Sequence, residues 1–596
     1  MAQVFGPDTF TVGADTNIDA YPSGDPDYAY NDGSGASLTV NAANDRVQVT
    51  VTGARQMARV IDAAAPTATQ EVFVDGLNVA ATDDSPHIGV RCNAVGAGEY
   101  YSADMEDIAA NELTVDRSDA GTFVNLTTGD RGLSGAATRR YRFRTIGTGA
   151  RVALEYQCDD TRPVVYTDTA ANRKTSGTPG CGTSNVAAAN SVWYDGLTID
   201  DLAATGFLAR CGTISIGTGA AGTTYQVEAL GFQPKVILLW WTKRNGNVNA
   251  AADADVSSGF GVAVTTTDRR CIAWQDDHGA GTTATDRYHS DVACVATLTI
   301  AGAVDGLADL SSLDADGFTL IVDDAFAAAI SVNYLALGGA DLTNMATGVF
   351  NEPGATGNHT EGALGFTPDF VLFFSAGIGA APPGAATNAM AMVGAATSST
   401  QRGVTLIRSN DAAINSTSRR YSISTECIVL LSTLSAPDYR EDFVSFGSGT
   451  FTLNCIEQTA GLRRVHYLAM AGGAYRVGNL LTKTDGTDIT VTGLENRPRA
   501  VFFASHCAAE STADTSQTEA KFSMGAFDSQ SAIDPARNRV CRCTKHEDAS
   551  AAADTGDAMR FDAVYANILV TDASIDALMD IKSVESTGFT CVMDNV

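Results

Sequence analysis

The chain has 596 residues, of which 18% are charged, and its formal net charge at pH 7 is −30. Affinity for nucleic acid rests on clustered Lys and Arg that release counterions, so this charge argues against a nucleic-acid partner and against an anionic membrane surface. The 57 glycines, together with short runs rich in Val, Thr, Phe and Tyr, are typical of an all-β protein with many turns.

The first ten residues, MAQVFGPDTF, lack the basic segment followed by an apolar one that marks a secretory signal. The longest apolar runs have the length of strands, so we expect no transmembrane helix and synthesis in a cytoplasm. Twelve cysteines are present and none forms a CxxC pair. The simplest interpretation is buried, reduced thiols, and a Cys158–Cys181 disulfide is the alternative.

Residues 1–204 contain short segments in which apolar and polar residues alternate, separated by Gly, Asp and Asn. Successive side chains of a strand point to opposite faces, so the pattern predicts a two-sheet sandwich with one polar face on each sheet. The strands predicted on this basis are 47–51, 71–74, 87–90, 112–115, 140–144, 152–156 and 193–199.

The run YRFRTIGTGARVALEYQ and the final strand beginning Trp193-Tyr194-Asp195-Gly196 resemble the concanavalin-like (laminin-G-like) jelly rolls. The resemblance covers residues 1–204 and implies a jelly-roll domain. It also implies a structural Ca²⁺ site between an amino-terminal turn and the last strand, and the matching positions are Asp8 and Asp195. The alternative is a turn-capping aspartate and an edge carboxylate.

Carbohydrate-binding members of that family present aromatic faces beside polar groups. The candidates here are Tyr100 and Tyr101 with the loop residues Asp159 and Asp160. The alternative for the two tyrosines is a packing role, since exposed aromatics in such domains also serve as interface residues.

Glycoside hydrolases of this fold carry an E-x-D-x-E strand, whose alternation places three carboxylates on one face. The nearest segment here has Glu106 and Asp107 adjacent, followed by Glu112. Neighbouring residues of a strand point to opposite faces, so the pair does not meet this requirement. We therefore expect no enzymatic activity.

The remaining two-thirds of the chain repeats one pattern three times, with a turn, a proline and an apolar run. The openings are LGFQP before VILLWW, LGFTP before FVLFF, and LENRP before AVFFA, with prolines at 234, 368 and 498. Periods of about 130 residues are those of whole domains. The predicted domains are a jelly roll at 1–204 and three homologous β-sandwich repeats at 205–340, 341–474 and 475–596, expected to form an array that provides reach.

Two smaller features of the first repeat bear on its surroundings. Trp240 and Trp241 alternate, so one of them must meet a second surface, either a loop or a partner domain. His278 and His289 flank a loop rich in Gly and Thr, and we interpret both as polar loop residues.

The third repeat differs from the other two at both ends. Its opening has Glu495-Asn496 where the others have Gly-Phe. In the first two repeats Phe318 and Phe451 are each followed 16 residues later by a tyrosine, Tyr334 in YLALGG and Tyr467 in YLAMAGG (318 to 334 and 451 to 467). No such segment follows Phe589, so we expect the third sandwich to lack its closing strand. Either a partner strand fills the groove or polar side chains cap the edge.

The repeat openings, as in Gly217-Thr218-Gly219 through Lys235, are similar to tandem domains of tailed-phage virion proteins. The resemblance implies a non-enzymatic virion component, made in the host cytoplasm, of the tail-fibre, head-fibre or decoration type. Its partners would be other virion proteins, copies of itself (a trimer if it is a fibre) and a host-surface glycan. The alternative is a bacterial surface adhesin, and a glycoside hydrolase is disfavoured.

Overall fold

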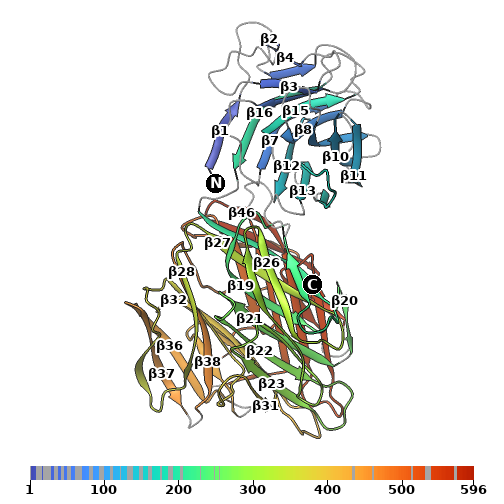
Figure 1. Ribbon diagram of the computed structural model, residues 1–596. Coiled ribbons are helices and arrows are strands. Elements are labelled where there is room, and N and C mark those ends of the chain that lie inside the picture. The colour runs from blue at the N-terminus through green and yellow to red at the C-terminus, as the bar shows by residue number, and fades with distance from the viewer. Residues whose placement is uncertain are drawn as a thin grey trace. The chain divides into compact units, whose positions relative to one another are not determined.

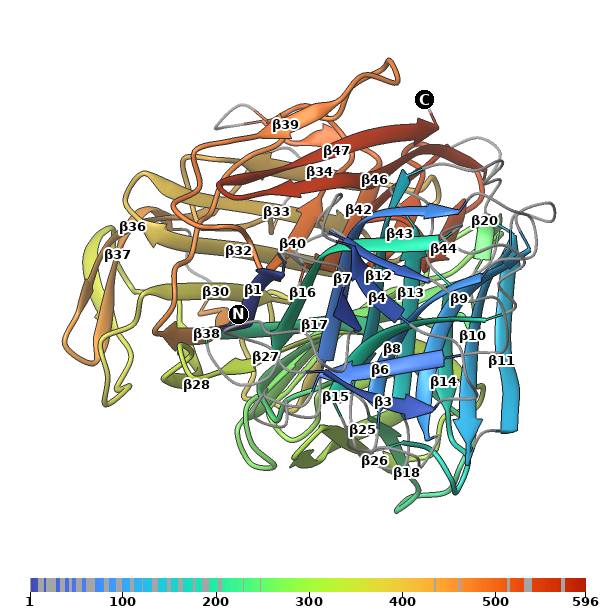
Figure 2. The ribbon, with the colours of Figure 1, turned by 90° about the horizontal axis from the view of Figure 1, so that it is seen from above.

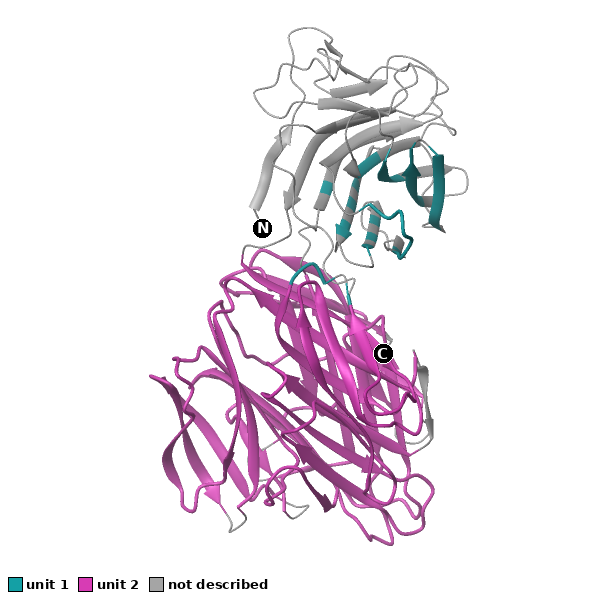
Figure 3. Ribbon diagram, viewed as in Figure 1, with its two compact units in different colours: residues 1–205, 228–232 teal, residues 206–227, 233–596 magenta. Residues whose placement is uncertain are grey.

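The computed structural model describes residues 2–8, 16–17, 28–32, 38–41, 46–49, 56–60, 70–79, 85–92, 99–107, 112–120, 122–130, 138–146, 152–158, 164–174, 178–184, 192–201, 206–228, 230–246, 248–253, 255–432, 436–458, 462–511, 515–529, 539–569 and 574–595. These residues fall into two compact units, one of residues 1–205 and 228–232 and the other of residues 206–227 and 233–596 (Figure 3).

The fold is all-β, as predicted, and every pairing between strands is antiparallel (Figure 1). Within the ranges given above there is no helix, and thus none long and apolar enough to cross a membrane.

The first unit is a sandwich of two sheets. The nine-stranded sheet contains, in spatial order, β14 (Val164–Asp168), β13 (Val152–Cys158), β12 (Thr138–Ile146), β7 (Gln70–Val79), β16 (Val192–Asp201), β5 (Arg46–Val49), β4 (Leu38–Asn41) and β2 (Thr16–Asn17), with β1 (Ala2–Asp8) also paired to β16. The seven-stranded sheet contains β11 (Thr122–Asp130), β10 (Glu112–Asp119), β9 (Tyr100–Asp107), β8 (Ser85–Cys92), β15 (Thr178–Ser184), β6 (Gln56–Val60) and β3 (Tyr28–Asp32). Every segment predicted as a strand in residues 1–204 overlaps one of these strands.

The second unit contains a large and a small sheet for each repeat. In the first repeat the large sheet is β17 (Phe207–Ile216), β27 (Ile330–Gly339), β19 (Pro234–Thr242), β21 (Val256–Ala263), β22 (Arg269–Asp276) and β23 (Thr285–Ser290). The small sheet is β18 (Thr224–Val227), β26 (Gly317–Asp324), β25 (Val304–Asp314) and β24 (Val295–Leu298).

The second repeat has the same strand order. Its large sheet is β28 (Asn344–Asn351), β38 (Arg464–Ala471), β30 (Phe370–Ser375), β32 (Met390–Ser398), β33 (Gln401–Ser409) and β34 (Ser418–Ile423). Its small sheet is β29 (Gly357–Glu361), β37 (Thr450–Gln458), β36 (Tyr439–Gly447) and β35 (Ile428–Leu430).

The third repeat has the small sheet but a shorter large one. Its small sheet, shown from dark orange to red in Figure 2, is β39 (Ile489–Val491), β47 (Gly588–Asn595), β46 (Ile575–Glu585) and β45 (Tyr565–Ile568). Its large sheet begins at β40 (Ala500–Ser505) and continues with β42 (Ala520–Asp528), β43 (Arg539–His546) and β44 (Thr555–Arg560).

The turns that open the repeats lie where the sequence predicts them. Gly231 (φ 83°) and Gly365 (φ 70°) adopt the left-handed conformation that glycine allows at no steric cost. The chain then enters β19 and β30, which lie inside their large sheets and contain the predicted VILLWW and FVLFF runs. Both apolar runs are strands rather than helices, as predicted.

The three large sheets share one hydrophobic core. Rings from different repeats meet edge to face, with centroids 5.3 Å apart for Trp240 and Phe502 and 5.3 Å apart for Phe260 and Phe374. Burial drives this packing, because a large sheet with two apolar faces needs a cover on each. The second surface predicted for the tryptophan pair is therefore a neighbouring repeat, which Trp240 contacts.

An arm from each repeat also adds a short strand to the large sheet of another. β31 (Gly384–Thr387) of the second repeat pairs with β23 of the first, and β41 (Gln517–Thr518) of the third pairs with β34 of the second. The circle closes where β20 (Val248–Asp253) of the first repeat pairs with β44 of the third.

The expectation of an extended array that provides reach is wrong, because a shared core and exchanged strands hold the three repeats in one compact unit. The predicted boundaries at 204/205, 340/341 and 474/475 stay a prediction.

Candidate functional site

The two tyrosines predicted to bind carbohydrate are both fully buried. Tyr100 packs on Phe123, with ring centroids 5.9 Å apart, and the Tyr101 hydroxyl donates to Asp168 Oδ2 at 2.8 Å. A sugar stacks on an exposed aromatic face, which neither ring offers. The two tyrosines therefore give no support to the predicted carbohydrate site, and Asp159 and Asp160 lie outside the described residues.

A buried ionic network surrounds Tyr101. Arg117 Nη1 donates to Asp168 Oδ2 at 2.9 Å, and Lys174 Nζ donates to Asp119 Oδ1 at 2.8 Å. Burial alone would raise the pKa of the Asp119 carboxyl, but hydrogen bonds from Lys174 and Arg117 outweigh it and lower that pKa below its ordinary value. The network is charge-compensated and joins β9, β10 and the segment after β14, so it has a structural role.

The two predicted calcium ligands lie close together along the backbone. Asp8 ends β1 opposite Leu197 of β16, and Asp195 is two residues away on that strand. The resemblance pairs the same two positions, and a Ca²⁺ ion there stays a prediction. Within the described residues, no group of three or more His, Cys, Asp and Glu side chains could hold a metal.

The acidic segment forms a hairpin that alternation along a single strand does not reveal. Asp107 ends β9 and pairs in register with Glu112, which begins β10. A local pattern does not reveal a cross-strand pair of this kind, because the pairing depends on where the chain turns. The expected absence of activity stays a prediction for all three acidic residues.

In the second unit, three equivalent loops, β22–β23, β33–β34 and β43–β44, meet at a polar junction. Each loop exchanges two backbone hydrogen bonds with the next, and the three pairs form a closed circle. Between the first and second loops, Thr283 N donates to Ala413 O at 3.0 Å and Ala412 N donates to Thr283 O at 2.8 Å. Between the second and third loops, Ser416 N donates to Ser550 O at 2.9 Å and Ala549 N donates to Ser416 O at 2.7 Å. Between the third and first loops, Ala553 N donates to Ala280 O at 2.9 Å and Gly279 N donates to Ala553 O at 2.6 Å.

This three-loop junction depends on backbone shape more than on side-chain identity. Gly279, Ala412 and Ala549 occupy equivalent places and all have positive φ, at 75°, 56° and 59°. Alanine in this conformation is strained, and such strain persists only where the surroundings hold it. Repeat alignment alone could not mark these positions, because two of the three residues are ordinary alanines.

A buried histidine pair lies between the first and second repeats. His289 in β23 and His466 in β38 are both fully buried, with Nε2 of His466 3.1 Å from Nδ1 of His289. The interpretation of His289 as a polar loop residue is wrong, because the second repeat covers β23 with β31, whose Gly384 pairs with His289. Only His278 lies in the loop, where its Nδ1 accepts from Thr555 N at 3.3 Å.

We expect this pair to make the second unit sensitive to acid. Burial, with Arg464 and Arg287 nearby, outweighs Asp291 and lowers the pKa of His289 to about 4. The unfolded imidazole binds protons below its ordinary pKa of about 6.5 while the folded one does not, so stability is lost as pH falls from 6.5 to 4. The effect at pH 5 should be on the order of 1–2 kcal/mol for this histidine.

Urea unfolding of the protein and of His289→Gln at pH 7 and pH 5 measures this effect. The unmodified protein should lose more stability between the two pH values than the variant does. Equal losses would contradict the assignment of a neutral, buried His289.

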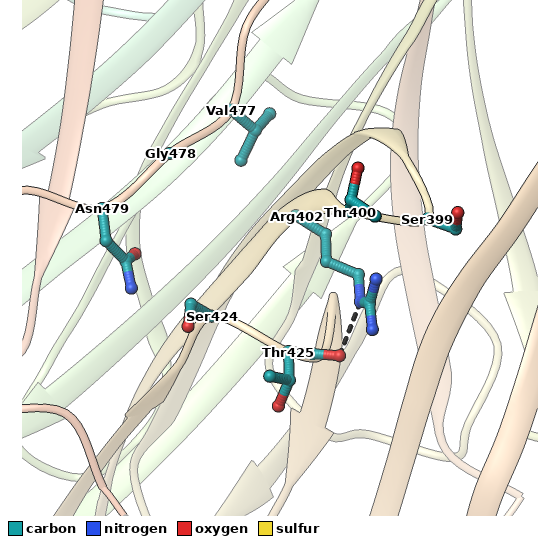
Figure 4. A pocket seen from close by; sticks show the side chains of 8 residues that line it. All are labelled: Ser399, Thr400, Arg402, Ser424, Thr425, Val477, Gly478 and Asn479. Atoms are coloured by element: carbon teal, nitrogen blue, oxygen red, sulfur yellow. Dashed lines mark hydrogen bonds between the residues drawn. The ribbon is translucent and has the colours of Figure 1, made fainter.

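A polar cavity of about 450 Å³ lies against the second repeat (Figure 4). Arg402 is the charged residue of its lining, and the Arg402 side chain is directed to the Thr425 carbonyl, to which Nε donates at 2.5 Å. The same Nε lies 3.1 Å from Asp442 Oδ1. Asp442 thus pairs with the one charged residue of the lining, and nothing in the cavity points to a particular ligand. The residues that line it are Ser399, Thr400, Arg402, Ser424, Thr425, Val477, Gly478 and Asn479.

The cysteines with described side chains form no disulfide. The nine cysteines whose side chains are described are free thiols, and eight of them are buried. Cys541 and Cys543 share one apolar cluster, as strand alternation predicts. The side chains of Cys158 and Cys181 lie outside what the structure describes, so their disulfide stays an alternative.

No family model and no curated protein matches the chain. Among solved structures, it is similar to a carbohydrate-binding module from Bacillus subtilis, at 12% identity over 29% of this chain and 94% of that chain, with a TM-score of 0.22. A lectin from Bauhinia forficata in complex with GalNAc is 9% identical over 31% and 98% of the two chains (TM-score 0.21). A prokaryotic β-1,3-1,4-glucanase from a mouse hindgut metagenome is 11% identical over 31% and 98% (TM-score 0.21). At these TM-scores the similarities carry no argument about ligand or activity.

Proposed function

We propose that the chain is a non-enzymatic structural protein of a tailed-phage particle, displayed on the particle surface as a fibre or a decoration. The observation that carries the proposal is the closed three-loop junction over a shared core, which joins three copies of one sandwich into a single block. Such a block suits mechanical display, because its interior is apolar and its polar loops bind one another. The resemblance of the repeat openings to phage virion domains supports the same role.

The first unit would then attach the block to the particle or bind a host-surface glycan. The two-sheet sandwich of this unit and its resemblance to concanavalin-like jelly rolls support a glycan as the ligand. The protein would associate with other virion proteins and with copies of itself, as a trimer if it forms a fibre.

A mass-spectrometric inventory of purified phage particles tests the proposal. We expect the chain to be present, at a few copies per particle for a fibre and at hundreds for a decoration. Absence from the particle, with recovery from the bacterial envelope instead, would favour the adhesin alternative and overturn the virion role.

The absence of catalysis has a separate test. The purified chain should release no reducing sugar from a panel of polysaccharides, since general acid–base cleavage of a glycoside needs two carboxylates at a set separation. Any sugar release is assayed again in Glu106→Gln, Asp107→Asn and Glu112→Gln. Turnover that disappears in one of these variants would show that the hairpin acids are catalytic and that the protein is an enzyme.

A further inference from the structure

The strand β40 has a neighbour on one side only. It pairs with β42 over its full length, from Ala500 opposite Asp528 to Ser505 opposite Ser523. In the described part of the chain no strand pairs with its other edge, so β40 ends the five-stranded sheet that begins at β20. The equivalent strands β19 and β30 lie between two neighbours in their sheets.

The exposure of β40 reflects the missing neighbour. Leu239 and Phe373, at equivalent places in β19 and β30, are 0% exposed, whereas Phe503 of β40 is partly exposed. All six residues of β40 are partly exposed, although Phe502 reaches the shared core and Phe503 packs in the core of the third repeat. An apolar strand with an open edge is a template for pairing with another chain.

The two complete repeats define what belongs beside β40. β27 places Tyr334 opposite Leu239, and β38 places Tyr467 opposite Phe373. Two residues further along the same strands, Ala336 lies opposite Ile237 of β19 and Ala469 lies opposite Val371 of β30. The strand at this place therefore alternates a small residue with a tyrosine.

The tyrosine also has a defined role in each core. Its ring meets the phenylalanine of the small sheet edge to face, with centroids 5.3 Å apart for Phe318 and Tyr334 and 5.1 Å apart for Phe451 and Tyr467. In the third repeat the corresponding Phe589 packs on Phe503, at 6.1 Å, as Phe451 packs on Phe373 at 5.6 Å, and it also meets Phe527 at 5.6 Å. Phe589 thus lacks the aromatic contact that its two counterparts make from the neighbouring strand.

We infer that the outer edge of β40 accepts an extended strand from a partner protein, which pairs antiparallel to it and places an aromatic residue opposite Phe503. Main-chain hydrogen bonds supply affinity in such strand addition, and the side-chain pockets supply specificity. The partner segment has the chemistry of β27 and β38, with alternating small and aromatic or aliphatic residues. This inference does not depend on the virion role.

Strands β27 and β38 of a second copy are not available as donors. The two segments with the required pattern, β27 and β38, are already paired along both edges. Neither strand can leave its sheet without exposing the core of its own repeat.

A synthetic peptide with the sequence of residues 464–471, RVHYLAMA, tests the inference on the full chain. The labelled peptide should bind at one site per chain in fluorescence anisotropy. It should also slow hydrogen exchange at residues 500–505, with little change in β19 and β30.

Two altered peptides serve as controls and leave the protein unchanged. Replacing the tyrosine by alanine (Tyr467→Ala in the peptide) should weaken binding about tenfold, because an edge-to-face aromatic contact is lost. Replacing Leu468 and Met470 by proline should abolish binding, because proline cannot donate to a strand ladder.

Three outcomes would overturn the inference. The first is an absence of peptide binding while residues 500–505 exchange freely. The second is protection of these residues in the peptide-free monomer, which would show that the chain covers its own edge. The third is a dimer in light scattering with β40 protected, which would show that a second copy covers it.

Discussion

Replacement of Gly394 by alanine should destabilise the second repeat and, through the shared core, the whole second unit. A Cβ atom at this position would lie 2.0 Å from the carbonyl oxygen of Cys427. That carbonyl cannot retreat, because Cys427 N is bound to Glu441 O at 3.0 Å in the small sheet behind it. The same contact recurs at 2.0 Å for Gly261 with Cys294 and for Gly525 with Val564, so the close approach of the two sheets is a feature of the repeat.

The expected loss is roughly 3 kcal/mol, the upper end of the cost of overpacking a core, since the obstructing atom belongs to the backbone. Urea unfolding followed by tryptophan fluorescence measures it, because three of the four tryptophans, Trp240, Trp241 and Trp274, lie in the first repeat, and a Trp193→Phe background removes the signal of the first unit. A shift in the tryptophan transition would show that the shared core couples the repeats. The matched control is Gly354→Ala, a position with nothing within 4 Å of the added atom, which should have no measurable effect.

A tryptophan transition unchanged in Gly394→Ala, together with an earlier loss of β-sheet signal in circular dichroism, would contradict that coupling. It would show that the repeats unfold independently in spite of their shared core.

Replacement of Arg244 by methionine should be the second severe change, because it breaks a buried ion pair between the first and third repeats. Arg244 Nε lies 2.5 Å from Asp557 Oδ1, and the Asp557 side chain is 0% exposed. Burial raises the pKa of Asp557 even with Arg244 present, and without the guanidinium the buried carboxylate has lost its partner. Removing one member of a buried pair costs about 3–5 kcal/mol.

The neighbouring residue provides the control. Lys243 lies 3.7 Å from Asp255 in a pair whose side chains are 38% and 36% exposed, so Lys243→Met should cost less than about 1 kcal/mol. Urea midpoints of both variants at pH 8 measure the difference. The stability difference between Arg244→Met and the unmodified protein should shrink as pH falls toward 5, since a protonated Asp557 no longer needs a cation.

The double variant Arg244→Met with Asp557→Asn should also recover part of the loss at pH 8. If Arg244→Met and Lys243→Met are equally stable, the arm that carries β20 does not depend on this pair.

Local sequence determined the strands and the opening turns. The alternation in residues 1–204 and the runs after the three prolines predict strands that the structure contains, because side-chain period and turn chemistry are properties of neighbouring residues. The glycines at 261, 394 and 525 likewise mark one recurring place in the sequence, although the carbonyl that requires them lies in another sheet.

Only the tertiary structure decided how the repeats are arranged and which side chains are accessible. The three-loop junction is formed by backbone groups, so Gly279 and Ala549 donate equivalent hydrogen bonds although they are different residue types. The repeats therefore share no sequence motif at these positions. Tyr101 and His289 look like surface residues in the sequence, yet both are buried, because segments distant in the chain cover them. Burial depends on contacts between residues far apart in the chain, and a local pattern carries no information about those contacts.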